Sequence, residues 1–468
     1  MTKRNESGPS KGPRIVRSPT ARQPLPSIGR RDRPLQHGEG GKPKVNPVPK
    51  AGPAPVVPVT GATINRRASD RIRNGHVWVY ASDVESIAGP APGGSGDVPL
   101  LLPVADNRGL LLGTALYSPT SQIALRMISH QFLSDAEWHR LLAERLRRAI
   151  ARRRPLLTEE SNACRLCFSE ADELPGVVAD KYGDLIVLQL LARGLDSAGV
   201  RSTCVRIIKD ELSPAAIVER PDPRVRELEG LSVPSAGPLW AADKHSPLTQ
   251  AAFRLNGLEF QYDANSGQKT GAFLDQRTNY LAAAEWALRL GATDSALDVC
   301  TYQGGFALHL AQRCRQVTGI DASRASLEVA ERNLAVNRKR LGAEVDWVEA
   351  DAFELLRDWS DARKSFDAIV LDPPAFAKTH RAVEGALRGY KELNLRALKM
   401  VRPGGLLVTC SCSHHVGWND LEGAVASAAA DAHRRVRLLE RRGAAPDHPV
   451  VLNLPETEYL KCLVLEVE

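Results

Sequence analysis

The sequence is sparse in cysteine and lacks any long apolar run. Its 468 residues include 8 cysteines spread along the chain, far below the density of a disulfide framework. We therefore expect reduced thiols in a cytoplasmic protein. No apolar run approaches the roughly 20 residues that cross a bilayer, and the start, MTKRNESGPSKGPR, lacks the apolar core of a signal peptide. No membrane partner is expected.

Acidic residues are scarce at one end of the chain. Residues 1–60 hold 12 Lys and Arg against 3 acidic residues, together with 12 of the 31 prolines. The segment carries about +9, and since the whole chain carries +7, the rest carries about −2. Such a segment cannot bury enough apolar surface to offset its ordering entropy, which predicts a disordered tail. It is either a solubilising extension or a basic arm that binds a polyanion by releasing counterions.

Residues 61–132 contain short β-rich runs separated by Gly, Pro and Asn-Arg-Gly turns, which predict a small β-barrel. The arginines that cluster near its start are Arg66, Arg67, Arg71 and Arg73. They form either a solvated charged edge or an edge that contacts RNA phosphates, and the cluster alone favours neither interpretation.

Residues 133–250 have the pattern of a central α+β domain. A helix is predicted at 134–155, because leucines recur there at helical spacing and Ser134 with Glu137 makes a capping box. Strand-like runs and a second helix near 197–211 follow.

The same segment holds Cys164 and Cys167 in CxxC spacing. A zinc site would need a second ligand pair nearby, and the sequence offers none, so we interpret these cysteines as structural.

Residues 251–468 alternate strand and helix patterns, which predicts a parallel sheet covered on both faces. The expected strands are 295–300, 316–321, 345–351, 366–372, 404–412 and 459–467.

A cofactor site is predicted at the carboxyl ends of these strands, where open α/β sheets bind ligands. Asp298 begins a strand–loop–helix stretch that contains Gly304 and Gly305. The next strand ends at Asp321, at the usual ribose-hydroxyl position, and the third ends at Asp351. The stretch lacks both the GxGxxG of dinucleotide sites and a P-loop, which favours an adenosyl ligand without a pyrophosphate. That ligand class indicates S-adenosylmethionine.

The fourth strand runs into LDPPAFAK, residues 371–378. Asp372 and the two prolines after it lie where substrate should meet cofactor, and the prolines prevent the backbone from continuing the sheet. Phe376 is a candidate for stacking on an RNA base.

Together these motifs resemble those of the RlmI-like ribosomal RNA large-subunit cytosine-C5 methyltransferases. The matching segments are RIRNGHVWVY, EADELPGVVADKYG, GQKTGAFLDQR, LDVCTYQGGF, GIDAS, LDPPAFAK, RGYKELNLRALKMVRPGG, SCS, DHPV and PETEYLK. The resemblance covers about residues 66–468 and excludes the tail. It implies a PUA-type RNA-binding barrel, a central α+β domain and a Rossmann-like class I methyltransferase domain.

The resemblance also implies an activity, the formation of 5-methylcytosine in large-subunit (23S) ribosomal RNA with S-adenosylmethionine as methyl donor. The cofactor residues carried over from the family are Asp298, Tyr302, Gly304, Asp321, Asp351 and Asp372, joined by Lys269, Thr270, Gln276 and Arg277. The long tail departs from the family pattern, and Cys410 matches none of its motifs.

The stretch VTCSCSHHV, residues 408–416, contains the predicted nucleophile. A thiolate that adds to carbon 6 of cytosine makes carbon 5 reactive enough to accept a methyl group. Strand alternation gives Cys410 and Cys412 the same facing, so facing does not choose between them. Cys412 lies nearer the ligand end and inside the SCS that matches the family. We therefore predict Cys412 as nucleophile and Cys410 as part of the strand body.

Zinc is the competing interpretation of this stretch, through both cysteines with His414 and His415. Adjacent alternating residues cannot all converge on one tetrahedral ion, so no metal is expected. The histidines are either solvated loop residues or contacts to RNA phosphate.

Asp372 is predicted to hydrogen-bond the base and help protonate its ring nitrogen. The acceptor of the carbon 5 proton stays open, with Lys378 or a water as guesses. A methyltransferase acting on another RNA position or atom, or a non-catalytic RNA-binding ribosome assembly factor, remains an alternative. The sequence also leaves open whether the protein is a homodimer.

Overall fold

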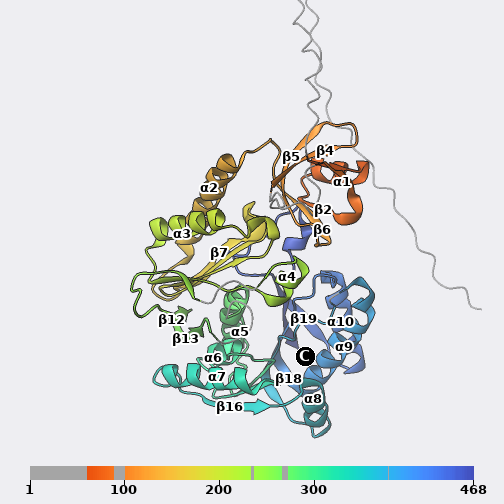
Figure 1. Ribbon diagram of the computed structural model, residues 1–468. Helices are drawn as coiled ribbons and strands as arrows, with labels where there is room; N and C mark the ends of the chain where they lie inside the picture. The colour runs from red at the N-terminus through yellow and green to blue at the C-terminus, as the bar shows by residue number, and fades with distance from the viewer. Residues whose placement is uncertain (1–60, 89–100, 233–236, 266–271, 378) are drawn as a thin grey trace, which may run out of the picture. The chain divides into compact units, whose positions relative to one another are not determined.

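The computed structural model describes residues 61–88, 101–232, 237–265, 272–377 and 379–468 (Figure 1). The expected tail at residues 1–60 and the predicted site residues Lys269, Thr270 and Lys378 lie outside the described residues.

The first described segment forms a six-stranded sheet with the strand order β2-β6-β5-β4-β1-β3. Its strands are β1 (Ala62–Ile64), β2 (Trp78–Tyr80), β3 (Val84–Ile87), β4 (Leu101–Asp106), β5 (Leu111–Tyr117) and β6 (Ile123–Ser129). A helix, α1 (Arg66–Arg73), follows β1, and the Asn65 side chain caps it by accepting from the Ala68 amide. The arginine cluster therefore lies on a helix, which corrects the expectation of a sheet edge.

The central segment packs helices against a five-stranded sheet of order β11-β10-β9-β8-β7. Its strands are β7 (Ala163–Phe168), β8 (Val177–Tyr182), β9 (Leu185–Leu190), β10 (Ala216–Glu219) and β11 (Pro238–Ala241), and its helices are α2 (Asp135–Arg153), α3 (Ala198–Leu212) and α4 (Pro223–Leu228). The capping box of Ser134 and Glu137 is confirmed at the start of α2. Cys164 and Cys167 are fully buried on β7, in the core that α2 and α3 cover.

A two-stranded hairpin, β12 (Gln250–Leu255) with β13 (Leu258–Asp263), precedes a seven-stranded sheet of order β16-β15-β14-β17-β18-β20-β19. The strands of this sheet are β14 (Ser295–Val299), β15 (Gln316–Asp321), β16 (Glu344–Glu349), β17 (Phe366–Leu371), β18 (Val401–Ser411), β19 (Val436–Arg442) and β20 (Lys461–Val467). Every expected strand is present. The expectation of an all-parallel sheet is wrong at one edge, because β20 runs antiparallel to both β18 and β19.

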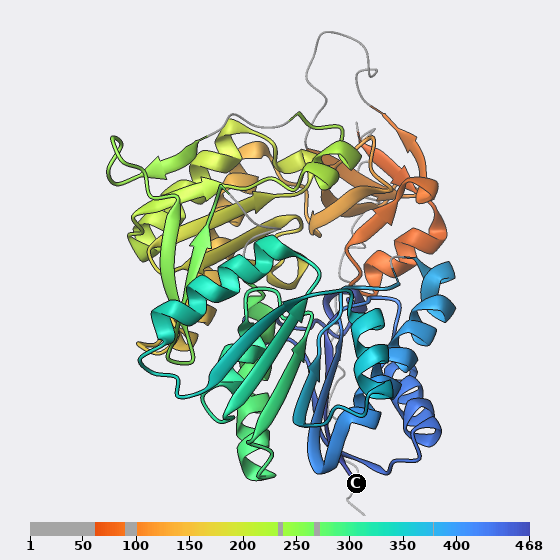
Figure 2. The ribbon, with the colours of Figure 1, turned by 90° about the horizontal axis from the view of Figure 1, so that it is seen from below.

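Helices cover both faces of this sheet, as its strand sequences require. On β17, Val370 packs into one core, whereas Ile369 and Leu371 pack into the core on the other side. Residues of α5 (Arg277–Arg289), α6 (Gly305–Leu310) and α7 (Arg324–Asn337) belong to the first core, and those of α8 (Ala352–Asp361), α9 (Val383–Met400) and α10 (Trp418–Asp431) to the second. Figure 2 shows the two helix groups on opposite sides of the sheet.

None of the helices in the described ranges combines the length and apolar content that a bilayer crossing needs.

Candidate active site

Four strand ends meet at one edge of the seven-stranded sheet, because β14, β15, β16 and β17 are parallel neighbours. Backbone hydrogen bonds tie the segments after them together. The Asp372 amide donates to the Val299 carbonyl at 3.2 Å, and the Ala350 amide donates to the Asp321 carbonyl at 3.1 Å. These hydrogen bonds hold the strand ends together rigidly. A ligand can therefore bind across several of them at this edge.

The loop after β14 has a strained backbone. Cys300 and Tyr302 have φ angles of 63° and 51°, in the left-handed region that non-glycine residues rarely adopt. The Tyr302 amide donates to Asp321 Oδ2 at 2.9 Å, which ties the loop to the end of β15. Gly305, at the start of α6, packs against an aromatic ring, because a Cβ there would lie 2.5 Å from Cζ of Tyr280.

The carboxylate of Asp298 holds this loop in place through hydrogen bonds. Its Oδ2 accepts hydrogen bonds from Thr301 Oγ1 at 2.5 Å and from the Ala307 amide at 2.8 Å. Its side chain is fully buried, and burial raises the pKa of Asp298 to about 7. It therefore holds the loop in shape and does not face the pocket directly.

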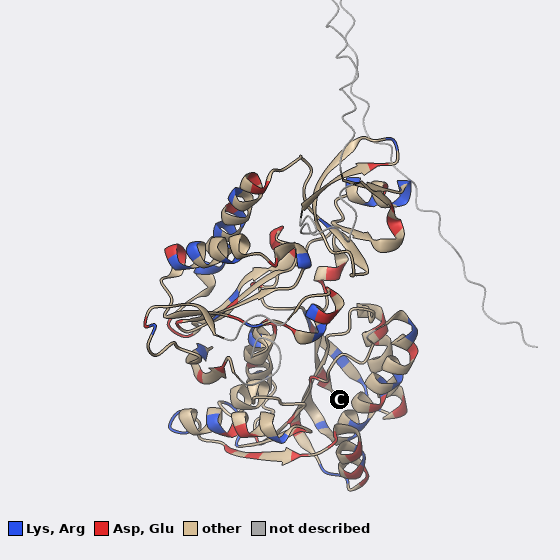
Figure 3. Ribbon diagram, viewed as in Figure 1, with Lys and Arg blue, Asp and Glu red and all other residues tan. Residues whose placement is uncertain are grey.

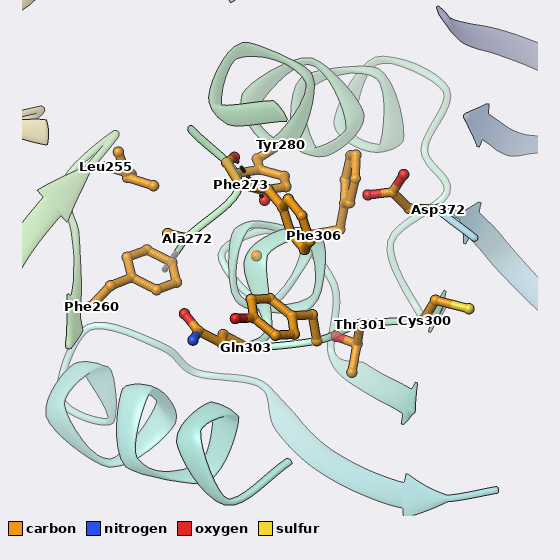
Figure 4. Close-up of a pocket in the computed structure, with 12 residues that line it drawn as sticks. Leu255, Phe260, Ala272, Phe273, Tyr280, Cys300, Thr301, Gln303, Phe306 and Asp372 are labelled. Carbon is orange, nitrogen blue, oxygen red and sulfur yellow. Dashed lines mark hydrogen bonds between the residues drawn. The ribbon is translucent and has the colours of Figure 1, made fainter. Parts of the chain in front are cut away.

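A pocket opens beside the loop (Figure 4). The residues that line it are Leu255, Phe260, Ala272, Phe273, Tyr280, Cys300, Thr301, Tyr302, Gln303, Gly305, Phe306 and Asp372. Its walls are largely aromatic, and the rings of Phe273 and Tyr302 have centroids 4.9 Å apart. A flat, partly apolar group such as an adenosyl moiety suits such walls.

Among the described residues that line the pocket, Asp372 is the one carboxylate. Gln276 Nε2 donates to Asp372 Oδ1 at 2.9 Å. Burial, reinforced by the neighbouring carboxylates Asp275 and Asp298, raises the pKa of Asp372 to about 8. At neutral pH this carboxyl group mostly holds a proton and can donate it.

The remaining predicted cofactor residues lie around the same edge. Asp321 accepts from the amides of Tyr302 and Ser323, and its oxygens keep lone pairs for ribose hydroxyls. Asp351 is exposed and caps α8 by accepting from the amides of Phe353 and Glu354. Acceptors at two successive strand ends beside an aromatic pocket fit an adenosine with its ribose.

Arg277 does not line the pocket. Its guanidinium is buried and donates to Asp447 Oδ2 and to the Ala163 carbonyl, both at 3.2 Å. Asp447 also accepts from the Arg165 amide at 2.8 Å. Arg277 therefore ties α5 to β7, whereas its neighbour Gln276 turns toward Asp372.

Cys412 follows the last residue of β18 and is partly exposed. Its Sγ lies 3.9 Å from the Pro373 carbonyl, in the Asp-Pro-Pro segment. Cys410 is fully buried and faces Cys462 across the β18–β20 ladder, and burial raises its thiol pKa well above the ordinary value. Cys412 thus lies beside the Asp-Pro-Pro backbone and is partly exposed, whereas Cys410, which also interacts with Gln276 and Asp372, is fully buried.

A hydroxyl network that sequence reasoning missed holds Cys412 in place. Ser411 Oγ donates to Tyr390 Oη at 2.8 Å, and Tyr390 Oη lies 3.0 Å from Ser413 Oγ. Ser413 Oγ also accepts from the Ala377 amide at 3.3 Å. Both serines and Tyr390 are buried, so α9 fixes the residues on each side of the cysteine. In the sequence, the available signal for this network was the pair of serines that flank a cysteine at a strand end.

The other candidates in this region have partners of their own. Phe376 is half-buried, and its ring centroid lies 4.8 Å from that of Tyr390 and 5.8 Å from that of Phe353. His414 packs near Tyr459, and His415 near His380. Within the described ranges, no group of three or more His, Cys, Asp or Glu could hold a metal ion.

The four arginines of α1 divide into two kinds. Arg71 forms an ion pair with Asp83, and Arg73 forms one with Asp106, each at 2.5 Å. The Arg66 side chain is 82% exposed and lies 3.9 Å from Asp70, and Arg67 is also exposed. Arg66 and Arg67 are thus the more open of the four, whereas Arg71 and Arg73 are engaged with carboxylates, although the Arg73 side chain remains 46% exposed.

The geometry can be compared with known proteins. A family model described as S-adenosylmethionine-dependent methyltransferase matches residues 228–463, and a PUA-like domain model matches residues 62–130. The chain is 36% identical over 412 residues to ribosomal RNA large subunit methyltransferase I of Pseudoalteromonas translucida, covering 87% of this chain and all of that protein. For the same-named protein of Klebsiella pneumoniae, the identity is 35% over 395 residues, covering 82% and 93%.

Solved structures share the fold. A methyltransferase named SMU.776, in complex with SAH, superposes with a TM-score of 0.70 at 18% identity, covering 86% of this chain and 99% of that one. A SAM-dependent methyltransferase from Streptococcus mutans gives a TM-score of 0.69 at 17% identity with the same coverage. These matches agree with a Rossmann-like methyltransferase domain preceded by a PUA-like domain.

Proposed function

The chain belongs to the ribosomal RNA large subunit methyltransferase I family of S-adenosylmethionine-dependent methyltransferases, and from this membership we propose that it forms 5-methylcytosine in 23S ribosomal RNA. The supporting observation is the position of Cys412, whose sulfur lies 3.9 Å from the Asp-Pro-Pro backbone beside the cofactor pocket. A methyltransferase acting on an exocyclic nitrogen would need no thiol there.

Cytosine carbon 5 is a poor nucleophile until a group adds to carbon 6. In the proposed reaction the Cys412 thiolate bonds to carbon 6, and the electron pair of the 5,6 double bond becomes available at carbon 5. Asp372 donates its proton to the ring nitrogen, which prevents negative charge from accumulating on the base. The raised pKa of Asp372 suits this role, because the group still holds a proton at neutral pH.

Bound S-adenosylmethionine supplies an electrophilic methyl group and leaves as S-adenosylhomocysteine. Asp321 and Asp351 would hold the adenosine, while Tyr302 and Phe273 enclose it. After methylation, carbon 5 carries both a methyl group and a proton. Loss of that proton to a base or water, expulsion of the Cys412 thiolate from carbon 6 and return of the ring-nitrogen proton to Asp372 restore the aromatic ring and the enzyme.

RNA is the proposed partner. The PUA-like segment would orient it through phosphate contacts, with Arg66 and Arg67 as the exposed candidates on α1. Basic residues also appear along α2 and α3 (Figure 3). The target base must leave its stack to reach Cys412, and Phe376 is a candidate to stack on it there.

The test is to map 5-methylcytosine in 23S ribosomal RNA from a strain that lacks the protein. The unmutated chain and the Cys410→Ala variant should both restore one modified position, whereas Cys412→Ala should restore none. An unchanged 5-methylcytosine map in the strain that lacks the protein would exclude this activity.

A further inference from the structure

Lys461, the first residue of β20, is a buried cation close to the proposed nucleophile. It is 3% exposed, and its Nζ donates to the carbonyls of Ser413 at 2.9 Å and Tyr459 at 3.0 Å. Among the residues that the structure describes, this ammonium group has main-chain carbonyls as hydrogen-bond partners and no ion pair. Buried lysines normally have a countercharge, so its placement requires an explanation.

Carboxylates do lie in the surroundings, but they bind other groups. Glu458 accepts from Trp418 Nε1 at 3.0 Å, and Asp420 accepts from the Gly417 amide at 2.9 Å. Both favour the charged form of Lys461 from a distance, as does Cys412, yet burial outweighs them and lowers the pKa of Lys461. Among the described residues, the ammonium is therefore held without an ion pair, and Cys412 is among the groups that favour its charged form.

Among the described residues, the titratable groups near Cys412 include two tyrosines and two histidines. Tyr390 approaches from α9 and Tyr459 from the segment before β20, and burial raises the pKa of both phenols. They therefore stay neutral near pH 7. His414 and His415 follow in the same loop, where His414 packs against Tyr459. Lys461, by contrast, is a basic side chain whose charged form Cys412 favours.

We propose that Lys461 is a positioning residue that stabilises the thiolate form of Cys412. Its ammonium fixes the Ser413 carbonyl, and hence the main chain next to the nucleophile, while its charge offsets that of the sulfur. When the S–H bond breaks, the proton passes to solvent water and the electron pair stays on sulfur, which then becomes the countercharge of Lys461. Lysine neighbours favour thiolates in this way in other reactive cysteines. The inference rests on the proposed function in taking Cys412 as the nucleophile.

Three substitutions separate charge from hydrogen bonding. Lys461→Gln keeps amide donors for the two carbonyls but removes the charge, Lys461→Arg keeps the charge, and Lys461→Met removes both. The exposed Lys399 on α9 offers a matched control in Lys399→Met. The readout is the alkylation rate of Cys412 by iodoacetamide against pH, followed by mass spectrometry of its peptide in the full-length protein.

The alkylation midpoint should rise by about one pH unit or more in Lys461→Gln and Lys461→Met, which corresponds to roughly tenfold slower alkylation near neutrality. Lys461→Arg and Lys399→Met should keep the original midpoint. S-adenosylmethionine binding by calorimetry checks that each variant folds, and if Lys461→Met does not, the Gln and Arg variants decide. A midpoint unchanged in Lys461→Gln would overturn the inference and leave Lys461 as a loop anchor only.

Adduct formation with 5-fluorocytosine RNA distinguishes this inference from the proposed function. If the unmutated protein forms the adduct but the alkylation midpoint of Cys412 does not change in the Lys461 variants, the inference fails and the proposed function stands. If the alkylation midpoint of Cys412 depends on Lys461 but no adduct forms, Lys461 does stabilise the Cys412 thiolate, and the proposed cytosine reaction is wrong.

Discussion

Single residues at the edge of the seven-stranded sheet differ sharply in what the sequence could predict about them. The places of Asp321 and Asp372 were predictable, because both lie at strand ends, whereas Asp298, also predicted to bind the cofactor, is buried beneath the loop and does not line the pocket. Arg277 was placed wrongly in the pocket, because its actual partner, Asp447, lies 170 residues away along the chain. Lys461 escaped notice for the same reason, since only the β18–β20 pairing brings it to Ser413.

Asp321 tests the cofactor site. Asp321→Ala should weaken S-adenosylmethionine binding by about 1.5–3 kcal/mol, roughly ten- to a hundredfold, because charge-assisted hydrogen bonds to the ribose are lost. Isothermal calorimetry measures this. The matched control is Asp294→Ala, whose side chain is 68% exposed before β14 and should leave the dissociation constant unchanged. Equal effects of the two substitutions would mean that the ligand lies elsewhere.

Asp372 gives a prediction for the pH profile. Because its pKa is raised to about 8 and its protonated form is the proposed acid, kcat/KM should fall as pH rises through about 8. Asp372→Asn cannot release a proton, so its residual activity should be much lower and should lack this falling limb. The profile is measured with saturating S-adenosylmethionine and limiting RNA. A limb that persists in Asp372→Asn would assign it to another group.

At the scale of elements, pattern reasoning found six strands of the seven-stranded sheet, including the edge strand β16, and missed the other edge strand. The apolar run of β17 has the length and the near-continuous burial that are typical of a central strand. The edge strand β19 was missed, because VRLLERR mixes charge into a half-exposed face. Helix α1 was missed because its eight residues, RRASDRIR, are mostly polar, and an Asn cap with a few buried contacts suffices to form it.

The loop between β14 and α6 yields a prediction about packing. In Gly305→Ala the new methyl group would meet Tyr280 at 2.5 Å, so the loop or the ring must shift. We expect a loss of about 1–3 kcal/mol in unfolding free energy and weaker cofactor binding. Denaturant midpoints and calorimetry measure both. Gly342→Ala, where a Cβ meets nothing within 4 Å, should be neutral, and equal losses in the two variants would remove the packing argument.

Over the whole molecule, the net charge is distributed unevenly along the chain. Residues 1–60 carry about +9, from 12 basic and 3 acidic residues, while the rest is nearly balanced. The PUA-like segment is joined to the remainder by specific contacts, such as Trp78 Nε1 to Glu170 Oε1 at 2.9 Å and His76 to Glu456 at 3.3 Å. We therefore propose that residues 1–60 attract RNA nonspecifically, whereas the PUA-like segment orients it.

Two deletions test this division. Removing residues 1–60 should weaken RNA binding and flatten its salt dependence, because fewer counterions are released, while the methylated nucleotide stays the same. Removing residues 1–130 should cost far more activity on RNA while sparing cofactor binding, provided that the remainder folds. Filter binding at several salt concentrations, with site mapping, measures both. A shifted methylation site or an unchanged salt slope after the short deletion would refute the nonspecific arm.

The central claim, that Cys412 attacks the base, is tested most directly by incubating the protein with 5-fluorocytosine-substituted 23S ribosomal RNA and S-adenosylmethionine. Fluorine at carbon 5 prevents the final proton loss, so the bond between sulfur and carbon 6 cannot be released. We predict a stable protein–RNA adduct that mass spectrometry maps to Cys412, persists in Cys410→Ala and disappears in Cys412→Ala. No adduct with the unmutated protein, or one mapped to Cys410, would contradict the account.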